Sequence, residues 1–224
     1  MSMLVLAALV FLVTHLGISS TPVRGMLIGV MGENIYLGFY SLLAAVTLGA
    51  LIYAWLEVGP TEIVWSLGVT GTAIARALMP IALILLVAGL MAKNPTAVKM
   101  DAAVSEEIPG ILKVTRHPVQ WAIFLWATAH LMSNGDQASI VFFGTFAVLA
   151  GIGTIALDKK HGARQEQEWQ HFYAVTSNVP FLAVITGRTR LQLSEQDWLA
   201  IGVGVVLFVG LYMFHDLVSG VSLY

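Results

Sequence analysis

The chain has 224 residues, of which 58% are hydrophobic and 11% charged, and its mean hydropathy is +0.82. A soluble domain of this length carries about 25% charged residues, so the composition predicts an all-α polytopic membrane helical bundle with the lipid bilayer as its surroundings. The net charge of −2 says nothing about nucleic acid, but no basic stripe with interleaved aromatics appears, so no nucleic-acid partner is predicted. The lack of cysteine leaves histidine as the only strong metal ligand besides carboxylates.

Six apolar segments are long enough to cross a hydrocarbon core of about 30 Å. The first lacks the basic start and the cleavage site of a signal peptide, so it is predicted to be retained. The predicted spans are residues 3–20, 35–58, 72–92, 119–133, 138–157 and 198–215. They form a single transmembrane domain over residues 1–224. The moderately apolar stretch 176–187 is too short to cross and is predicted to be interfacial or re-entrant.

Lysine and arginine are concentrated in the first, third and fifth loops, which hold ten of the eleven basic residues. Cytoplasmic loops carry this excess, so we predict a multi-pass protein of the bacterial inner membrane with both termini periplasmic. Arg76, a turn inside the third span, is the exception. The ten others are Arg24, Lys93, Lys99, Lys113, Arg116, Lys159, Lys160, Arg164, Arg188 and Arg190.

Two histidines, His15 and His130, lie inside predicted spans, where an ionisable residue is by default a functional-site candidate. A rise of about 1.5 Å per residue puts His15 near the middle of its span and His130 roughly 5 Å outward from the middle of its own. Two neutral imidazoles on different helices at similar depth can ligate one haem iron. The alternative is that each histidine hydrogen-bonds a neighbouring helix, which contributes about 0.6 kcal/mol.

The motif Arg116-His117-Pro118 begins the fourth span. His117 lies about 20 Å along the helix from His130, so the two cannot share one compact site. His117 is either a further cofactor contact or a boundary residue before the helix-starting proline. Arg76 and Arg116 are the candidate partners for haem propionates, although Arg76 can also snorkel to the outer interface and pair with Glu62. The polar residues of the fifth loop are predicted to be solvated, namely Asp158, Lys159, Lys160, His161, Glu166, Glu168 and His171.

Five motifs follow one another along nearly the whole chain: Thr14-His15-Leu16-Gly17, Lys93-Asn94-Pro95-Thr96, the segment from Gly110 to Pro118, Ala129-His130-Leu131, and Thr176 to Phe181 followed by Gly187-Arg188. Together they resemble the NnrU family of membrane proteins, which is named for its association with denitrification and includes zeta-carotene cis–trans isomerases.

The isomerase resemblance implies a haem b held by His15 and His130, and an apolar substrate such as a polyene. The isomerase carries a cysteine at the position of Ala127, thought to exchange as an axial ligand, and this chain has none. The resemblance therefore implies bis-histidine haem binding without implying a ligand-switching mechanism. It also leaves open a haem sensor and a non-enzymatic factor that assists nitrite and nitric oxide reductases.

A second resemblance is to membrane methyltransferases of the isoprenylcysteine and phospholipid type. In such enzymes the ArgHisPro motif and a later carboxylate would hold S-adenosylmethionine, because its carboxylate binds arginine and its amine binds glutamate. This alternative uses Arg116, His117 and Glu168 but gives no role to His15 and His130, so haem binding is preferred. The matching residues further along are Glu166, Glu168, Phe172, Tyr173 and Val179-Pro180.

Overall fold

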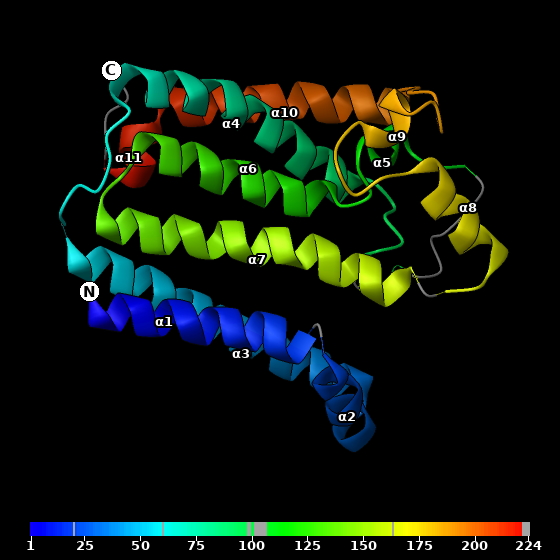
Figure 1. Cartoon of the computed structure of the whole chain (residues 1–224), viewed down its shortest axis with the longest axis horizontal. Helices are drawn as coiled ribbons and strands as arrows, with labels where there is room; N and C mark the ends of the chain where they lie inside the picture. Colours follow the sequence, from blue (N-terminus) through cyan, green and yellow to red (C-terminus); the bar gives the residue numbers. More distant parts are fainter. Residues whose placement is uncertain (20, 60, 98–99, 101–106, 163, 221–224) are drawn as a thin grey trace. The chain divides into compact units, whose positions relative to one another are not determined.

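A computed structural model describes residues 1–19, 21–59, 61–97, 100, 107–162 and 164–220 (Figure 1). These residues are helical apart from turns, irregular links and one isolated antiparallel bridge between Ile63 and Asp136. The all-helical prediction is therefore confirmed. Two residues named in the sequence predictions, Ser20 and Lys99, lie outside the described residues.

Four helices are long and apolar enough to cross a membrane: α3 (Glu33–Val58), α4 (Gly68–Met91), α7 (Gln137–His161) and α10 (Glu195–Met213). They coincide with the second, third, fifth and sixth predicted spans. A fifth candidate consists of α1 (Ser2–Leu12) with the π-helix η1 (Val13–Ile18), followed after a 75° bend by α2 (Pro22–Met31). Helix α6 (Pro118–Ser133) matches the fourth predicted span but has only 16 residues, fewer than the roughly 20 that a crossing requires. The structure thus supports four to five spans, and the count of six is not confirmed.

Several short helices lie largely outside the predicted spans. They are α5 (Gly110–Val114), α8 (Gln167–Val175), α9 (Leu182–Ile185) and α11 (His215–Ser219). Helix α9 lies in the stretch predicted to be interfacial or re-entrant. Helix α8 forms because Trp169 and Phe172, three positions apart, share its buried face. Phe181 and Ile185 around α9 are 47% and 79% exposed, while the interfacial or re-entrant placement of this stretch stays a prediction.

The described chain divides into two compact units. Unit 1 comprises Met1–Ala75 and Ala127–Ala156, and unit 2 comprises Arg76–Trp126 and Leu157–Tyr224. The prediction of one transmembrane domain over residues 1–224 stays a prediction.

In unit 1, α1 packs along α3, and the segment before α4 is tied to the turn between α6 and α7. The Trp65 indole donates to the carbonyl of Leu131 at 3.1 Å, and the Val64 amide donates to the carbonyl of Gly135 at 2.8 Å. Asp136 caps α7 by accepting from the Ser139 amide at 3.0 Å. These bonds fix the end of α6, where His130 lies.

Unit 2 is built around an apolar core that α4, α5, α8 and α10 share. Gly204 lets α10 approach α4 closely, because a Cβ there would lie 2.8 Å from the Cα of Ile84. Ser194 and Asp197 form a capping box at the start of α10. Asp197 also accepts from the Ile111 amide at 3.2 Å, which joins α5 to this end of α10. The core thus holds α5 in place just before the Arg116-His117 pair.

Gly71 provides a test of the packing in unit 1. A Cβ at this position would collide with the backbone carbonyl oxygen of Met132. We therefore expect Gly71→Ala to lower the free energy of unfolding by about 1–3 kcal/mol, measured by thermal unfolding in detergent. The matched control is Gly49→Ala in α3, where a Cβ meets nothing within 4 Å and alanine favours the helix by up to about 1 kcal/mol. Equal melting temperatures for the two variants would contradict this packing.

Candidate functional site

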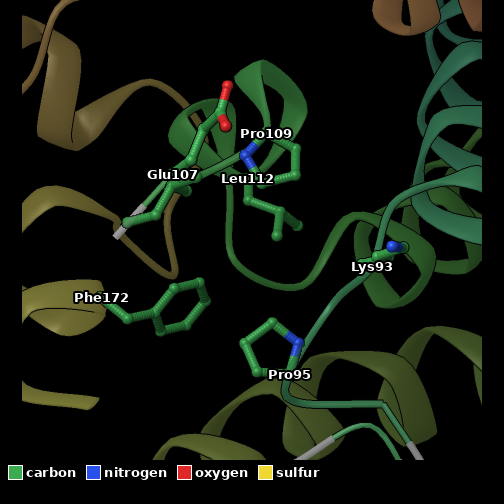
Figure 2. Close-up of a pocket in the computed structure, with 7 residues that line it drawn as sticks. Lys93, Pro95, Glu107, Pro109, Leu112 and Phe172 are labelled. Carbon is green, nitrogen blue, oxygen red and sulfur yellow. The ribbon is translucent and has the colours of Figure 1, made fainter. Parts of the chain in front are cut away.

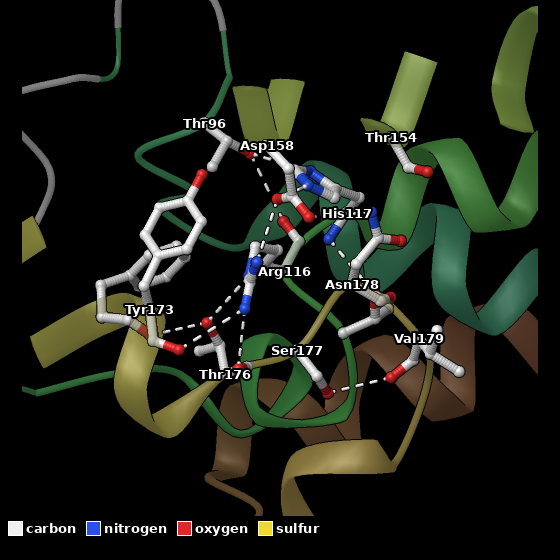
Figure 3. Close-up of polar contacts among 12 residues, drawn as sticks. Thr96, Arg116, His117, Thr154, Asp158, Tyr173, Thr176, Ser177, Asn178 and Val179 are labelled. Carbon is white, nitrogen blue, oxygen red and sulfur yellow. Dashed lines mark hydrogen bonds and ion pairs between the residues drawn. The ribbon is translucent and has the colours of Figure 1, made fainter. Parts of the chain in front are cut away.

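A buried polar cluster in unit 2 gathers around Asp158, in the last turn of α7 (Figure 3). Its Oδ1 accepts from Arg116 Nη1 at 3.0 Å and from His117 Nε2 at 2.8 Å, while Oδ2 accepts from Asn178 Nδ2 at 3.0 Å. Arg116 and His117 are only 7% and 2% exposed. A buried cation requires a charged partner, and Asp158 is that partner for Arg116.

Local sequence places Arg116 and His117 on an extended link between two helices. Helix α5 ends at Thr115, whose φ and ψ of −155° and 141° are extended, and Pro118 begins α6. A proline pushes the preceding residue out of helical conformation and suits the first helical position. The backbone groups of the link are bonded elsewhere: the Arg116 amide donates to the Ser177 carbonyl at 2.9 Å, and Asn94 Nδ2 donates to the Arg116 carbonyl at 3.0 Å.

The Arg116 guanidinium is held by groups of the protein itself. Besides Asp158, it donates through Nη2 to the Thr176 carbonyl at 2.8 Å and through Nε to the Thr176 hydroxyl at 3.2 Å. It also lies 4.2 Å from the centre of the Tyr173 ring, a favourable cation–π contact. Both ligand-binding roles predicted for Arg116, with a haem propionate or with S-adenosylmethionine, need a carboxylate at the position that Asp158 holds here.

The protonation states in the cluster follow from burial. Burial lowers the pKa of His117, with Asp158 opposing this shift and Arg116 adding to it, so the imidazole is neutral at neutral pH. Since a carboxylate accepts, Nε2–H must donate to Asp158, and the lone pair is then on Nδ1, 3.5 Å from the Thr96 hydroxyl. Burial, assisted by the charge of Asp158, raises the pKa of Tyr173 to about 12, so its phenol stays protonated.

His15 lies in unit 1 on the π-helix η1, a rare helix form that often marks functional sites. Its Nδ1 is 2.8 Å from the backbone carbonyl oxygen of Phe11. A carbonyl can only accept, so Nδ1 carries the proton and the lone pair of the neutral ring is on Nε2. Metal-binding histidines usually donate their other N–H in this way. The His15 side chain therefore has the tautomer that suits a metal ligand.

His130 also lies in unit 1, on α6, with its ring stacked at 4.5 Å on Phe143 of α7. A continuous series of aromatic contacts links it to His15. The centroid separations are 4.0 Å for His15–Phe11, 5.5 Å for Phe11–Phe146, 5.3 Å for Phe146–Phe142 and 5.1 Å for Phe142–Phe143. The structure thus places both predicted ligands in one unit and in one aromatic environment.

The other predicted site residues lie in unit 2. Arg76 is exposed on α4, 5.7 Å from the centre of the Tyr212 ring. Glu62, its predicted partner, lies in unit 1, where it accepts from Gln137 Nε2 at 3.1 Å, and the pairing with Arg76 stays a prediction. Glu168, named for the methyltransferase alternative, is exposed, as is His171.

Two predictions of solvated side chains were wrong. His161 is 1% exposed and stacks on Trp169 at 5.0 Å, because α8 brings that indole onto the end of α7. Asp158 is the acceptor at the centre of the buried cluster. The sequence analysis did not identify Asp158 and Asn178 as members of a site. One signal was present: a carboxylate at the end of one apolar run and an ArgHisPro motif at the start of another can form an ion pair.

A small pocket in unit 2 lies between helix α8 and the segment that follows α4 (Figure 2). It has a volume of about 10 Å³, which is room for about one water molecule. Its lining is mostly apolar, with Lys93 and Glu107 at its edge: Lys93, Pro95, Glu107, Ile108, Pro109, Leu112 and Phe172.

Asp158→Asn tests whether the cluster holds unit 2 together. The substitution leaves the buried Arg116 without its anionic partner, so we expect the free energy of unfolding to fall by about 3 kcal/mol. Glu166→Gln is the matched control, because Glu166 is exposed and such surface changes stay within about 0.5 kcal/mol. Thermal unfolding of both variants in detergent is the measurement. An Asp158→Asn variant as stable as the control would show that Arg116 does not depend on this carboxylate.

Comparisons with known proteins agree with the motifs. The chain matches the NnrU protein family over residues 3–223. Over 127 residues it is 29% identical to "15-cis-zeta-carotene isomerase, chloroplastic" of Arabidopsis thaliana, a match that covers 50% of this chain and 32% of that protein. The matched stretch is thus about a third of the plant protein's length. No solved structure matches. Because the family match covers nearly the whole chain, this protein belongs to the NnrU family.

Proposed function

We propose that this NnrU protein binds haem b in the membrane through His15 and His130 and supports cis–trans isomerisation of an apolar polyene. The observation that carries the proposal is the His15 tautomer: donation from Nδ1 to the Phe11 carbonyl leaves the Nε2 lone pair for a metal. The name of the plant relative supports the reaction class.

The residues present in unit 1 fit a haem. The donor set consists of two imidazoles, which suit iron, in a chain with no thiolate to compete. In the series of contacts, the rings of Phe11, Phe146, Phe142 and Phe143 lie between the two histidines, so they exclude water and would have to move apart for both imidazoles to reach one iron. When bound, haem supplies a redox-active iron at the centre of a flat apolar ring. The protein's own part is to hold the two imidazoles, orient His15 through Phe11 and keep water away.

The surface around His15 supports an apolar substrate. None of the residues of η1 is buried, and Val13 is 67% exposed. A polyene dissolves in the hydrocarbon core, so it can approach this turn from the lipid without crossing water. The polar cluster around Asp158, in contrast, is closed by its own hydrogen bonds and has a structural role in this proposal.

A role in nitrite or nitric oxide metabolism is the second candidate, and the family membership favours it. A haem at His15 and His130 would serve a sensor or a maturation factor equally well. Haem binding is common to both candidates and is therefore the property to test first.

The haem proposal predicts a Soret band in protein purified from haem-replete cells. Two imidazole ligands should give a low-spin ferric spectrum, and His15→Ala or His130→Ala should lose haem or become high-spin. His171→Ala is the matched control, because that histidine is exposed on α8, and its spectrum should be unchanged. Wild-type protein without Soret absorbance, or wild-type spectra in both intramembrane variants, would refute the proposal.

We also propose a bacterial inner-membrane location with both termini periplasmic, which the distribution of lysine and arginine supports. Alkaline phosphatase fused to the C-terminus should then be active, and green fluorescent protein fused at the same position should be dark. The reverse pattern would overturn this orientation.

A further inference from the structure

We infer that Arg24 is the residue that binds the carboxylates of the haem, its propionates. This inference rests on the proposed function. It differs from the sequence predictions, which named Arg76 and Arg116 as propionate partners.

Arg24 has a distinct place in the charge distribution. Residues 1–75 and 127–156, which form unit 1, contain both His15 and His130 and a single lysine or arginine, Arg24. A haem carries two carboxylates, and anions in a weakly polar setting require a cation. Within the unit that holds both ligands, Arg24 is the cation that the sequence provides.

Aromatic contacts lead from Arg24 to His15. The guanidinium lies 5.6 Å from the centre of the Tyr36 ring. Tyr36 and Tyr40, four residues apart on α3 and so on one face, stack at 5.8 Å with an interplanar angle of 17°. Tyr40 meets the His15 ring edge-on at 6.0 Å. Three ring contacts therefore connect the Arg24 guanidinium with the His15 ring within unit 1, so a porphyrin ligated at His15 would have Arg24 on the face of α3 that carries Tyr40 and the buried Tyr36.

Arg24 is only loosely engaged among the described residues. Its Nη2 lies 3.8 Å from Glu33 Oε1, and the two side chains are 31% and 56% exposed. A charge-assisted hydrogen bond spans about 2.7–2.9 Å, and an exposed pair of this kind contributes little to stability. An incoming carboxylate can replace Glu33 at little cost. Arg116, by contrast, is bonded to Asp158 and Thr176 and would have to give up those buried bonds.

The test titrates detergent-solubilised, haem-free full-length protein with haem b and with haem b dimethyl ester, in which both carboxylates are blocked. Binding is followed by the Soret band for the wild type, Arg24→Gln and Arg190→Gln. The last variant removes a positive charge from an exposed arginine of unit 2 and is the matched control.

We expect Arg24→Gln to weaken haem binding about ten- to a hundredfold while the low-spin spectrum is retained, because a charge-assisted bond is lost and both imidazoles remain. Wild-type protein should bind the ester more weakly than haem, and Arg24→Gln should not weaken ester binding further. The two changes are then coupled, as a direct contact requires.

The outcomes separate this inference from the proposed function. If the wild type binds neither compound, the haem proposal fails and the inference fails with it. If the wild type binds haem but Arg24→Gln weakens haem and ester equally, Arg24 acts through the fold or a lipid head group, and only the inference is overturned. The same holds if Arg24→Gln binds haem like Arg190→Gln.

Discussion

The carboxylate of Asp158 joins three parts of unit 2 that are far apart in sequence: the start of α6, the end of α7 and the segment that follows α8. Arg116, His117 and Asn178 each donate to it. The apolar surroundings make this bond necessary, because a buried guanidinium without a counter-charge destabilises the fold by several kcal/mol. The remaining donors of Arg116 bond to the hydroxyl and the carbonyl of Thr176. These bonds position the segment 176–178.

Unit 1 satisfies its polar groups in a different way. His15, one of its two histidines, donates to the carbonyl of Phe11, about one turn earlier in the continuous helix that α1 and η1 form. The side chain of Thr14 likewise donates to the carbonyl of Val10 at 2.8 Å. Local hydrogen bonds of this kind satisfy backbone carbonyl groups and the Nδ1–H donor of His15. Beyond the polar contacts at its start, α7 packs against its neighbours through aromatic rings such as Phe142, which stacks on Trp55 at 4.5 Å.

The sequence predicts the helices well because an apolar run has few other choices in lipid. Every segment predicted as a span is helical, although α6 is too short to count as a crossing. The prediction of His15 and His130 as a pair is consistent with their placement in one unit, while their role as ligands stays a prediction. Their similar depth in the membrane, predicted from helix rise, stays a prediction as well.

The failures concern residues whose environment depends on tertiary contacts. Asp158, beside two lysines at the end of a span, has the sequence of a solvated helix end. Its position at the end of one apolar run, with ArgHisPro at the start of another, is a weak signal of pairing with Arg116, and no signal points to Asn178. The prediction that His161 is solvated was wrong for the same reason, because Trp169 contacts His161 only when α8 is formed. Helix α8 itself has only a short amphipathic pattern, which is a much weaker signal than the long apolar runs of the spans.

The two polar sites therefore differ in what they can do chemically. In the Asp158 cluster both carboxylate oxygens accept hydrogen bonds, and the guanidinium donates to Asp158 and to Thr176, so a ligand could enter only by displacing protein groups. At His15 one ring nitrogen is committed to Phe11, and the tautomer that this bond imposes puts a lone pair on the other. Hydrogen bonds to three donors suit a structural role for Asp158, and a lone pair in an apolar setting suits a metal ligand at His15. This difference supports the proposal that His15 and His130 of unit 1 carry the chemistry, whereas ArgHisPro, the motif most prominent in the sequence, stabilises the fold of unit 2.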